Sequence, residues 1–249
     1  MEYKVITLAE RYDLFRKQDD LAEEVWPEFM KHDPVANKNW MKFVDAHKEF
    51  QLMIMEGDEI LATASSVPFY FDKPVEELPE NGWDWGVLKA ISDIEKNVKA
   101  NLLLGLQIVV NKKYQGRGLS SIAVKEMAAL ASRHGFEKLV IPVRPCDKHK
   151  YPLIPIDDYI TWKNDKDLPF DNWLRVHVKC GGTIIKPCHQ AMRIPGTIAD
   201  WKKWTGLDFP GSGKYTVPFA LNPITVDIEK DEAVYIEPNV WVLHNRKND

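Results

Sequence analysis

Two glycines and a cluster of basic residues lie between an apolar run and an amphipathic segment, an arrangement suited to binding phosphate. Gly116 and Gly118 let the backbone approach a ligand closely, because no Cβ stands in the way. Lys112, Lys113 and Arg117 add positive charge to the same turn. The first N–H groups of a helix lack partners within the helix, and the helix dipole adds partial positive charge there. The turn therefore predicts a site for a pyrophosphate, although a ligand-free strand–turn–helix fits the glycines equally well.

The segments on either side of the turn fit such a site. Residues 101–110 form a continuous apolar run, which is typical of a strand buried on both faces. From Leu119 to Ala131 apolar residues recur with the helical period, and Gly135 suits the end of that helix. The glycine spacing matches neither the dinucleotide fingerprint nor the Walker loop. The sequence therefore predicts a buried strand, a phosphate-type turn and an amphipathic helix.

Composition limits the class of protein. With 249 residues and 45% hydrophobic side chains, the chain can bury a full core, and we expect one domain over residues 1–249. A net charge of −4 gives no reason to expect nucleic acid or a membrane as partner. The sparse cysteines and the absence of a signal-peptide core predict a cytoplasmic location. Nine tryptophans are many for this length, and some could wall a pocket.

Other elements are expected on both sides of the central strand and helix. Alternating or apolar runs predict strands at Tyr3–Leu8, Glu49–Met55, Glu59–Phe69, Glu137–Val143 and Thr183–Ile194. Caps and periodic apolar residues predict helices after Asp20, over Trp40–His47, over Val87–Val98, after Asp171 and over Thr197–Trp204. His32-Asp33-Pro34 is interpreted as a helix end. The tail from Tyr215 to His244 is rich in strand signals.

The turn also resembles a known family. Gln115-Gly116-Arg117-Gly118-Leu119-Ser120 is similar to the Q/R-x-x-G-x-G/A motif of the GCN5-related N-acetyltransferase (GNAT) superfamily, with Ser120 at the final small position. The resemblance implies that these six residues cradle the pyrophosphate of acetyl-CoA. It also implies that the preceding strand splays from its neighbour and pairs its backbone with the pantetheine arm. The strand residues concerned are Ile108, Val109 and Val110.

The resemblance carries an expectation for fold and activity. It implies an α/β fold with a mixed, mostly antiparallel central sheet flanked by helices, with a core of about residues 1–195 and a strand-rich C-terminal elaboration of about 196–249. The implied activity is transfer of an acyl group from acetyl-CoA or another acyl-CoA directly to an amine of a small molecule or peptide, without a metal. A backbone N–H near Val110 would bind the oxyanion. Gln107 stands near the place where many relatives have a carboxylate, so no general base is identified.

A histidine occupies the position of the usual acid. Family members commonly carry a tyrosine on the last helix, four residues before a Gly-Phe pair, which lies near the CoA sulfur and protonates the leaving thiolate. His177 stands at that position, and Gly181-Gly182 replaces the Gly-Phe pair. Histidine can exchange a proton near neutrality. The resemblance therefore predicts His177 as the catalytic acid; the alternative is a core histidine bonded to backbone.

Two further functions follow from the same region. Arg175-Val176-His177, before Cys180, is similar to the GNAT-like loading domains of polyketide synthases. Those domains use a histidine in decarboxylating an acyl-CoA, and they pass the acyl group to a carrier-protein thiol. A non-catalytic acyl-CoA sensor is the third possibility. Turnover of a CoA thioester separates the sensor from the enzymes, and the product, amide or thioester, separates the two enzymes.

Other polar residues are weaker candidates. A zinc site would draw on His177, Cys180, Cys188 and His189, but adjacent strand residues point to opposite sides. Cys146 lacks the partners of a cysteine nucleophile. The long proline-rich loop from Arg144 to Pro169 follows a buried strand, so we expect it to form part of the acceptor pocket. Its acidic residues could attract an amine or merely solvate the loop: Asp157, Asp158, Asp165, Asp167 and, just after it, Asp171.

Overall fold

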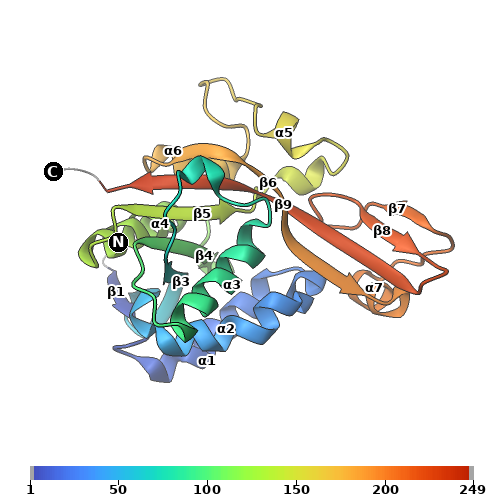
Figure 1. Cartoon of the computed structure of the whole chain (residues 1–249). Helices are drawn as coiled ribbons and strands as arrows, with labels where there is room; N and C mark the ends of the chain where they lie inside the picture. The colour runs from blue at the N-terminus through green and yellow to red at the C-terminus, as the bar shows by residue number, and fades with distance from the viewer. Residues whose placement is uncertain (1–2, 247–249) are drawn as a thin grey trace.

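A nine-stranded mixed sheet forms the centre of this computed structural model, which describes residues 3–246 (Figure 1). Its strands are β1 (Lys4–Thr7), β2 (Gln51–Glu56), β3 (Glu59–Phe69), β4 (Leu102–Val110), β5 (Lys138–Val143), β6 (Thr183–Gly196), β7 (Gly213–Tyr215), β8 (Ile224–Asp227) and β9 (Glu232–Asn245). They follow the order β1-β2-β3-β4-β5-β9-β8-β7, and β6 pairs with β9 off this path. Among the described residues, β4 and β5 alone pair in parallel. The predicted α/β class with a mostly antiparallel sheet is confirmed.

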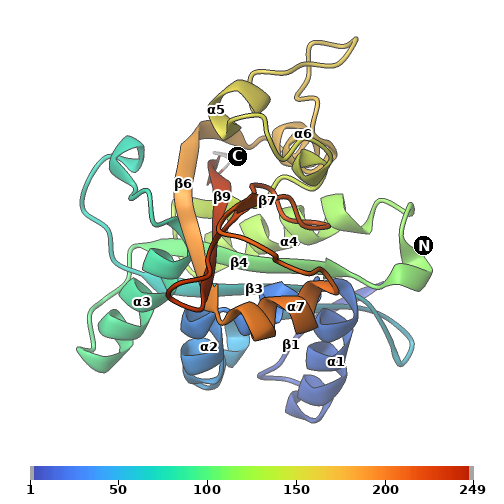
Figure 2. The same ribbon diagram turned by 90° about the vertical axis from the view of Figure 1, so that its right-hand side faces the viewer.

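Helices cover both faces of the sheet (Figure 2). They are α1 (Phe15–Val25), α2 (Pro34–Ala46), α3 (Gly82–Glu95), α4 (Leu119–Arg133), α5 (Ile156–Tyr159), α6 (Asn172–Lys179) and α7 (Ile198–Thr205). Short 3₁₀ helices occupy Tyr12–Leu14, Glu28–His32, Lys48–Phe50, Val75–Glu77, Lys112–Tyr114 and Lys148–Lys150. Within residues 3–246, no helix is both long and apolar enough to cross a membrane.

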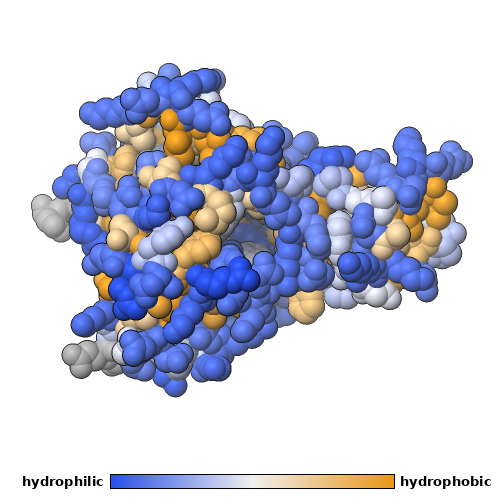
Figure 3. Space-filling model, turned by 90° about the horizontal axis from the view of Figure 1, so that it is seen from below, coloured by the Kyte–Doolittle hydropathy of each residue, from blue (hydrophilic) through white to orange (hydrophobic). Residues whose placement is uncertain are grey.

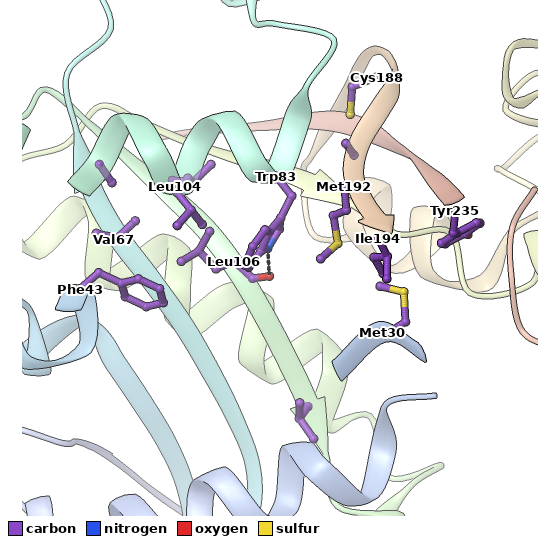
Figure 4. Close-up of a cluster of buried hydrophobic side chains, with 14 of the residues drawn as sticks. Met30, Phe43, Val67, Trp83, Leu104, Leu106, Cys188, Met192, Ile194 and Tyr235 are labelled. Atoms are coloured by element: carbon purple, nitrogen blue, oxygen red, sulfur yellow. Dashed lines mark hydrogen bonds between the residues drawn. The ribbon is translucent and has the colours of Figure 1, made fainter. Parts of the chain in front are cut away.

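Strand β4 is buried on both faces, as its apolar run predicts. Leu102, Leu104 and Leu106 pack into the core under α1, α2 and α3, whereas Leu103 packs into the core under α4 and α6. This alternation follows the two-residue period of a strand. Figure 4 shows Leu104 and Leu106 of β4 in the first of these cores, together with Phe43 of α2 and Val67 of β3. The sheet is therefore the middle layer of three.

β4 and β5 diverge soon after they meet. Their parallel pairing is confined to Leu103–Leu139 and Leu104–Val140. Beyond it, a register shift against β3 leaves Leu106 as an extra residue, which is a β-bulge. The Trp83 indole N–H donates to the Leu106 carbonyl at 2.9 Å and so holds the bulge (Figure 4). A bulge bends its strand, so the outer half of β4 leaves a gap beside β5.

Two helices begin earlier than the sequence predicts. α1 starts at Phe15, and Asp20, expected to cap it, instead pairs with Arg16 one turn away. A 3₁₀ helix, Glu28–His32, ends at the expected break, but Asp33 also caps α2 by accepting from the Ala36 N–H at 2.6 Å, so α2 begins at Pro34 rather than at Trp40. Proline fits the first helical position, where its missing N–H would have had no partner.

The C-terminal strand belongs to the central sheet. β9 pairs with β5 from Lys138–Asn245 to Val143–Val240, and it also pairs with β6. The expected core boundary near residue 195 is therefore wrong, because the last core strand lies beyond it. The added segment is an insertion between β6 and β9, residues 197–231, which carries α7, β7 and β8 (Figure 1). Residues 247–249 of the expected domain lie outside the described part.

Candidate active site

The glycine turn leads into α4 as predicted. Gly116 and Gly118 have φ angles of 78° and 77°, in the left-handed region that side chains rarely adopt, and Gly118 is the N-cap of α4. A Cβ at either position would meet no atom within 4 Å. The backbone conformation therefore favours glycine here, and the space beside the helix start is open to a ligand.

The basic residues of the turn differ in their partners. Lys112 donates to the Glu24 carbonyl at 2.5 Å, so it ties the turn to the end of α1. The Arg117 guanidinium lies over the Tyr114 ring, 5.1 Å from its centroid. Lys113 and Arg117 are exposed at the turn, where both can meet a phosphate. Two of the three predicted cations are therefore exposed beside the helix start.

A cavity of about 770 Å³ occupies the gap between β4 and β5. The space-filling view from below, the side on which α1 and α2 lie, is hollowed near its middle (Figure 3). Four of the predicted CoA-binding residues line the cavity: Ile108, Val110, Gln115 and Ser120. Val109 and Leu119 are buried in the two cores instead, while Gly116, Arg117 and Gly118 lie exposed on the turn. The turn and the outer half of β4 thus border one continuous space.

An apolar wall bounds the cavity on the side of α1, α2 and α3. Trp26, Trp40, Trp83 and Met30 line it, and Met192 of β6 joins them. Figure 4 shows Trp83, Met30 and Met192 in this region. Charged side chains lie along the same wall: Arg16, Asp19, Glu23 and Lys31. The expectation that some tryptophans wall a pocket is confirmed.

A buried ion pair lies at the opposite wall. Glu237, fully buried in β9, accepts from Arg144 Nε at 3.0 Å and from the Tyr235 hydroxyl at 2.9 Å. Burial opposes the charge of Arg144, but Glu237 outweighs it and the pKa of Arg144 is raised. Burial and the nearby carboxylate raise the pKa of Tyr235 far above its ordinary value, so its hydroxyl stays protonated and donates. Sequence reasoning missed Glu237, because no motif marks it.

His149 is the histidine that lines the cavity among the described residues. Its Nδ1 lies 2.9 Å from the Cys146 carbonyl, so in the neutral imidazole Nδ1 carries the proton and Nε2 is the acceptor. Cys146 lines the cavity too, and although the residue is exposed, partial desolvation, together with Asp171 and Asp147, raises the pKa of its thiol to about 12. A thiol with that pKa is a poor nucleophile at neutral pH. The long loop thus contributes to the cavity through its first residues, Arg144 to His149.

His177 does not line the cavity. It is 0% exposed, and its Nδ1 lies 3.0 Å from His244 Nε2. Trp173, one turn earlier on α6, lines the cavity, and its ring centroid is 4.3 Å from that of His177. Burial, and then His244, lowers the pKa of His177 to about 3, so it is neutral near pH 7 and has no proton to spare. This geometry argues against the predicted role of His177 as catalytic acid.

The residues considered as zinc ligands do not lie together, and each has different contacts. His189 contacts Glu80 and Asp157, Cys180 contacts the Ser121 carbonyl, and Cys188 is fully buried. Cys146, Asp147 and Asp171 do lie together, but their carboxylates already accept from backbone N–H groups, Lys150 and Tyr159. Asp171 caps α6 as predicted. None of the loop's acidic residues lines the cavity, so the structure gives them no contact with an acceptor.

The two buried histidines should make stability fall in acid. Burial also lowers the pKa of His244 to about 4, so both side chains stay neutral in the folded protein. The unfolded chain takes up protons below about pH 6.5, so stability is full above that pH and declines toward pH 4 by up to roughly 1.4 kcal/mol per pH unit for each histidine. Thermal unfolding from pH 7 to pH 4.5 measures this slope, and His177→Gln should flatten it. An unchanged slope in the variant would contradict the assignment.

These features define the class of protein. Two parallel strands diverge around a cavity, and a glycine turn opens a helix at its border. The chain belongs to the acetyltransferase (GNAT) family, whose family model matches residues 11–153, and it is an acyltransferase. The arginine N-acetyltransferase avaD of Aspergillus versicolor is 32% identical over 273 aligned residues, which cover 97% of this chain and 93% of that relative.

Two solved structures share the fold. The loading GNATL domain of CurA from Lyngbya majuscula superposes with a TM-score of 0.64 at 17% identity and covers 98% of each chain. The GphF GNAT-like decarboxylase in complex with isobutyryl-CoA has a TM-score of 0.58 at 13% identity, covering 99% of this chain and 100% of that one. At these identities the likeness concerns the fold alone. The predicted family and the local likeness to loading domains are confirmed at that level.

Proposed function

We propose that this protein transfers an acyl group, with acetyl as the first candidate, from an acyl-CoA to an amine-type nitrogen of a small molecule. One observation carries the proposal: a single cavity joins the glycine turn to the apolar wall of α1 and α2 through the gap between β4 and β5. A thioester held along β4 would meet an acceptor standing against that wall. The relative named as an arginine N-acetyltransferase supports a nitrogen acceptor and makes arginine the first one to test.

The turn and β4 would bind the donor. Backbone N–H groups at the start of α4, with Gln115 and Arg117, would hold the pyrophosphate. The pantetheine arm would then follow the backbone of Ile108–Val110. A strand rises about 3.3 Å per residue, so Val110 and Gly105 are roughly 17 Å apart, comparable to the reach of an extended pantetheine arm. We therefore place the thioester beside the bulge at Gly105–Gln107, and the oxyanion contact there rather than near Val110.

His149 is the proposed general base. Its Nε2 would take a proton from the acceptor nitrogen as that nitrogen forms a bond to the thioester carbon. The tetrahedral intermediate then expels the CoA thiolate, the C–S bond breaks, and the imidazolium or water returns a proton to sulfur. Gln107 lines the cavity but cannot accept the proton. The described cavity offers no other imidazole.

Acceptor-dependent release of free CoA thiol tests the proposal. Purified protein is incubated with acetyl-CoA alone and with arginine, simple alkylamines or arylalkylamines, and the thiol is followed by its reaction with a chromogenic disulfide. We expect slow release without acceptor and a rate that saturates with acceptor concentration. CoA binding without release in any mixture would favour the acyl-CoA sensor instead.

A further inference from the structure

A strained phenylalanine borders the cavity. Val217 to Ala220 form a turn closed by the Ala220 N–H to the Val217 carbonyl at 3.2 Å, with Pro218 and Phe219 at its centre. Phe219 has φ 69°, a value that a proline-led turn of this kind normally reserves for glycine. A bulky side chain is strained in this conformation, which persists where surrounding contacts impose it.

Three contacts hold the turn in place. Arg144 Nη2 donates to the Phe219 carbonyl at 2.6 Å, and the buried Lys148 donates to the Leu221 carbonyl at 2.8 Å. The Leu221 N–H donates to the Tyr235 hydroxyl at 2.7 Å. Through these bonds the insertion is fastened to the loop after β5 and to β9. The position of Phe219 is therefore fixed before any ligand arrives.

The ring of Phe219 faces outward despite this strain. Phe219 is 57% exposed and lines the cavity, and its ring centroid lies 5.6 Å from that of His149, at 41° between the planes. Trp26, Trp40 and Trp83 line the same cavity. The Phe219 ring is thus held in a strained conformation and yet left exposed. Burying such a large apolar ring would be favourable, so it offers contact surface to a ligand. Something apolar that enters the cavity can cover it.

We infer that Phe219 is a specificity-determining residue for the acceptor, and that the acceptor carries a flat aromatic group beside its reactive nitrogen. This inference rests on the proposed function, since it assigns the acceptor end of the same cavity. Aromatic rings attract one another in edge-to-face or offset arrangements, which an alkyl chain cannot reproduce. The tryptophan wall and Phe219 would enclose such a group, with its nitrogen near His149.

Equilibrium binding to the CoA-loaded protein tests the inference. The probes are 2-phenylethylamine and n-octylamine, two amines with the same number of carbon atoms, measured by isothermal titration. We expect Phe219→Gly and Phe219→Ala to weaken the binding of 2-phenylethylamine roughly 5- to 30-fold and the binding of octylamine by at most about twofold. Phe219→Tyr should keep the wild-type preference. Equal losses for both amines, or no loss for the aromatic one, would overturn the assignment.

The glycine and alanine variants separate the loss of the ring's contact with the amine from any change in the stability of the protein. Glycine relieves the positive φ and should raise the melting temperature, whereas alanine keeps the strain and should not. Both remove the ring, so both should change the amine preference alike. If the preference follows the melting temperature instead, Phe219 acts only on the fold. If no amine is acylated by the wild type but the ring-dependent preference persists, the proposed function fails while the aromatic subsite stands.

Discussion

Gly118→Asp should reduce CoA affinity roughly 100- to 1,000-fold while the protein stays folded. Aspartate is a good N-cap residue and tolerates the left-handed conformation better than most residues, so α4 should still form from this position. Its carboxylate would stand beside the proposed pyrophosphate site, where two like charges about 4 Å apart cost on the order of 4 kcal/mol. Isothermal titration measures the affinity, and circular dichroism checks the fold.

Two control variants separate the effect of the added charge from the effect of its position on α4. Gly118→Asn has the size of aspartate without the charge and should keep most of the affinity. Gly135→Asp puts the same residue at the other end of α4, where φ is 80° and a Cβ would likewise meet nothing within 4 Å. It should bind CoA like the wild type. Equal affinities for Gly118→Asp and Gly135→Asp would disprove the pyrophosphate site at the turn.

His149→Gln should lower kcat roughly 10²- to 10⁴-fold, the usual contribution of a positioned acid–base group. Glutamine keeps the size and polarity of the side chain but cannot accept the proton. The KM for acetyl-CoA should hardly change, because the phosphates are bound at the turn. Steady-state kinetics at saturating acceptor, with the melting temperature measured alongside, give the result.

His177→Gln is the matched comparison. Because His177 is buried against His244 and away from the cavity wall, its replacement should lower the melting temperature and leave the turnover of the folded fraction nearly unchanged. The opposite pattern, with His149→Gln active and His177→Gln inactive at full stability, would restore the role predicted for His177 from its position in the motif. It would also require the donor sulfur to reach α6.

Local sequence predicts the centre of this fold well. The run of apolar residues in β4, the glycines of the turn and the helical period of α4 each reflect physical demands within a few neighbouring residues. The hairpin of β2 and β3, and the Asp171 cap of α6, are confirmed for the same reason. Where the first turn of a helix lacks a strong signal, as at Phe15, the predicted start is late.

Contacts between distant segments could not be predicted in this way. His177 and His244 are 67 positions apart, and only their contact makes His177 a core residue. The cavity wall likewise joins Arg144 to Glu237, 93 positions away. Phe219 carries a weak local signal, because Pro218 before it favours a turn that needs a positive φ at the next residue. The sequence of β9 carries no local signal for its position in the sheet, because the residues of a strand do not specify which strands it pairs with.

The chemical identity of the product tests the central claim most directly. Protein, acetyl-CoA and the best acceptor from the thiol assay are incubated, and the acceptor is analysed by mass spectrometry before and after treatment with neutral hydroxylamine. We predict an acceptor heavier by one acetyl group in a bond that hydroxylamine leaves intact, as an amide should be. An acceptor of unchanged mass, or an acetyl group that hydroxylamine removes, would contradict N-acyl transfer.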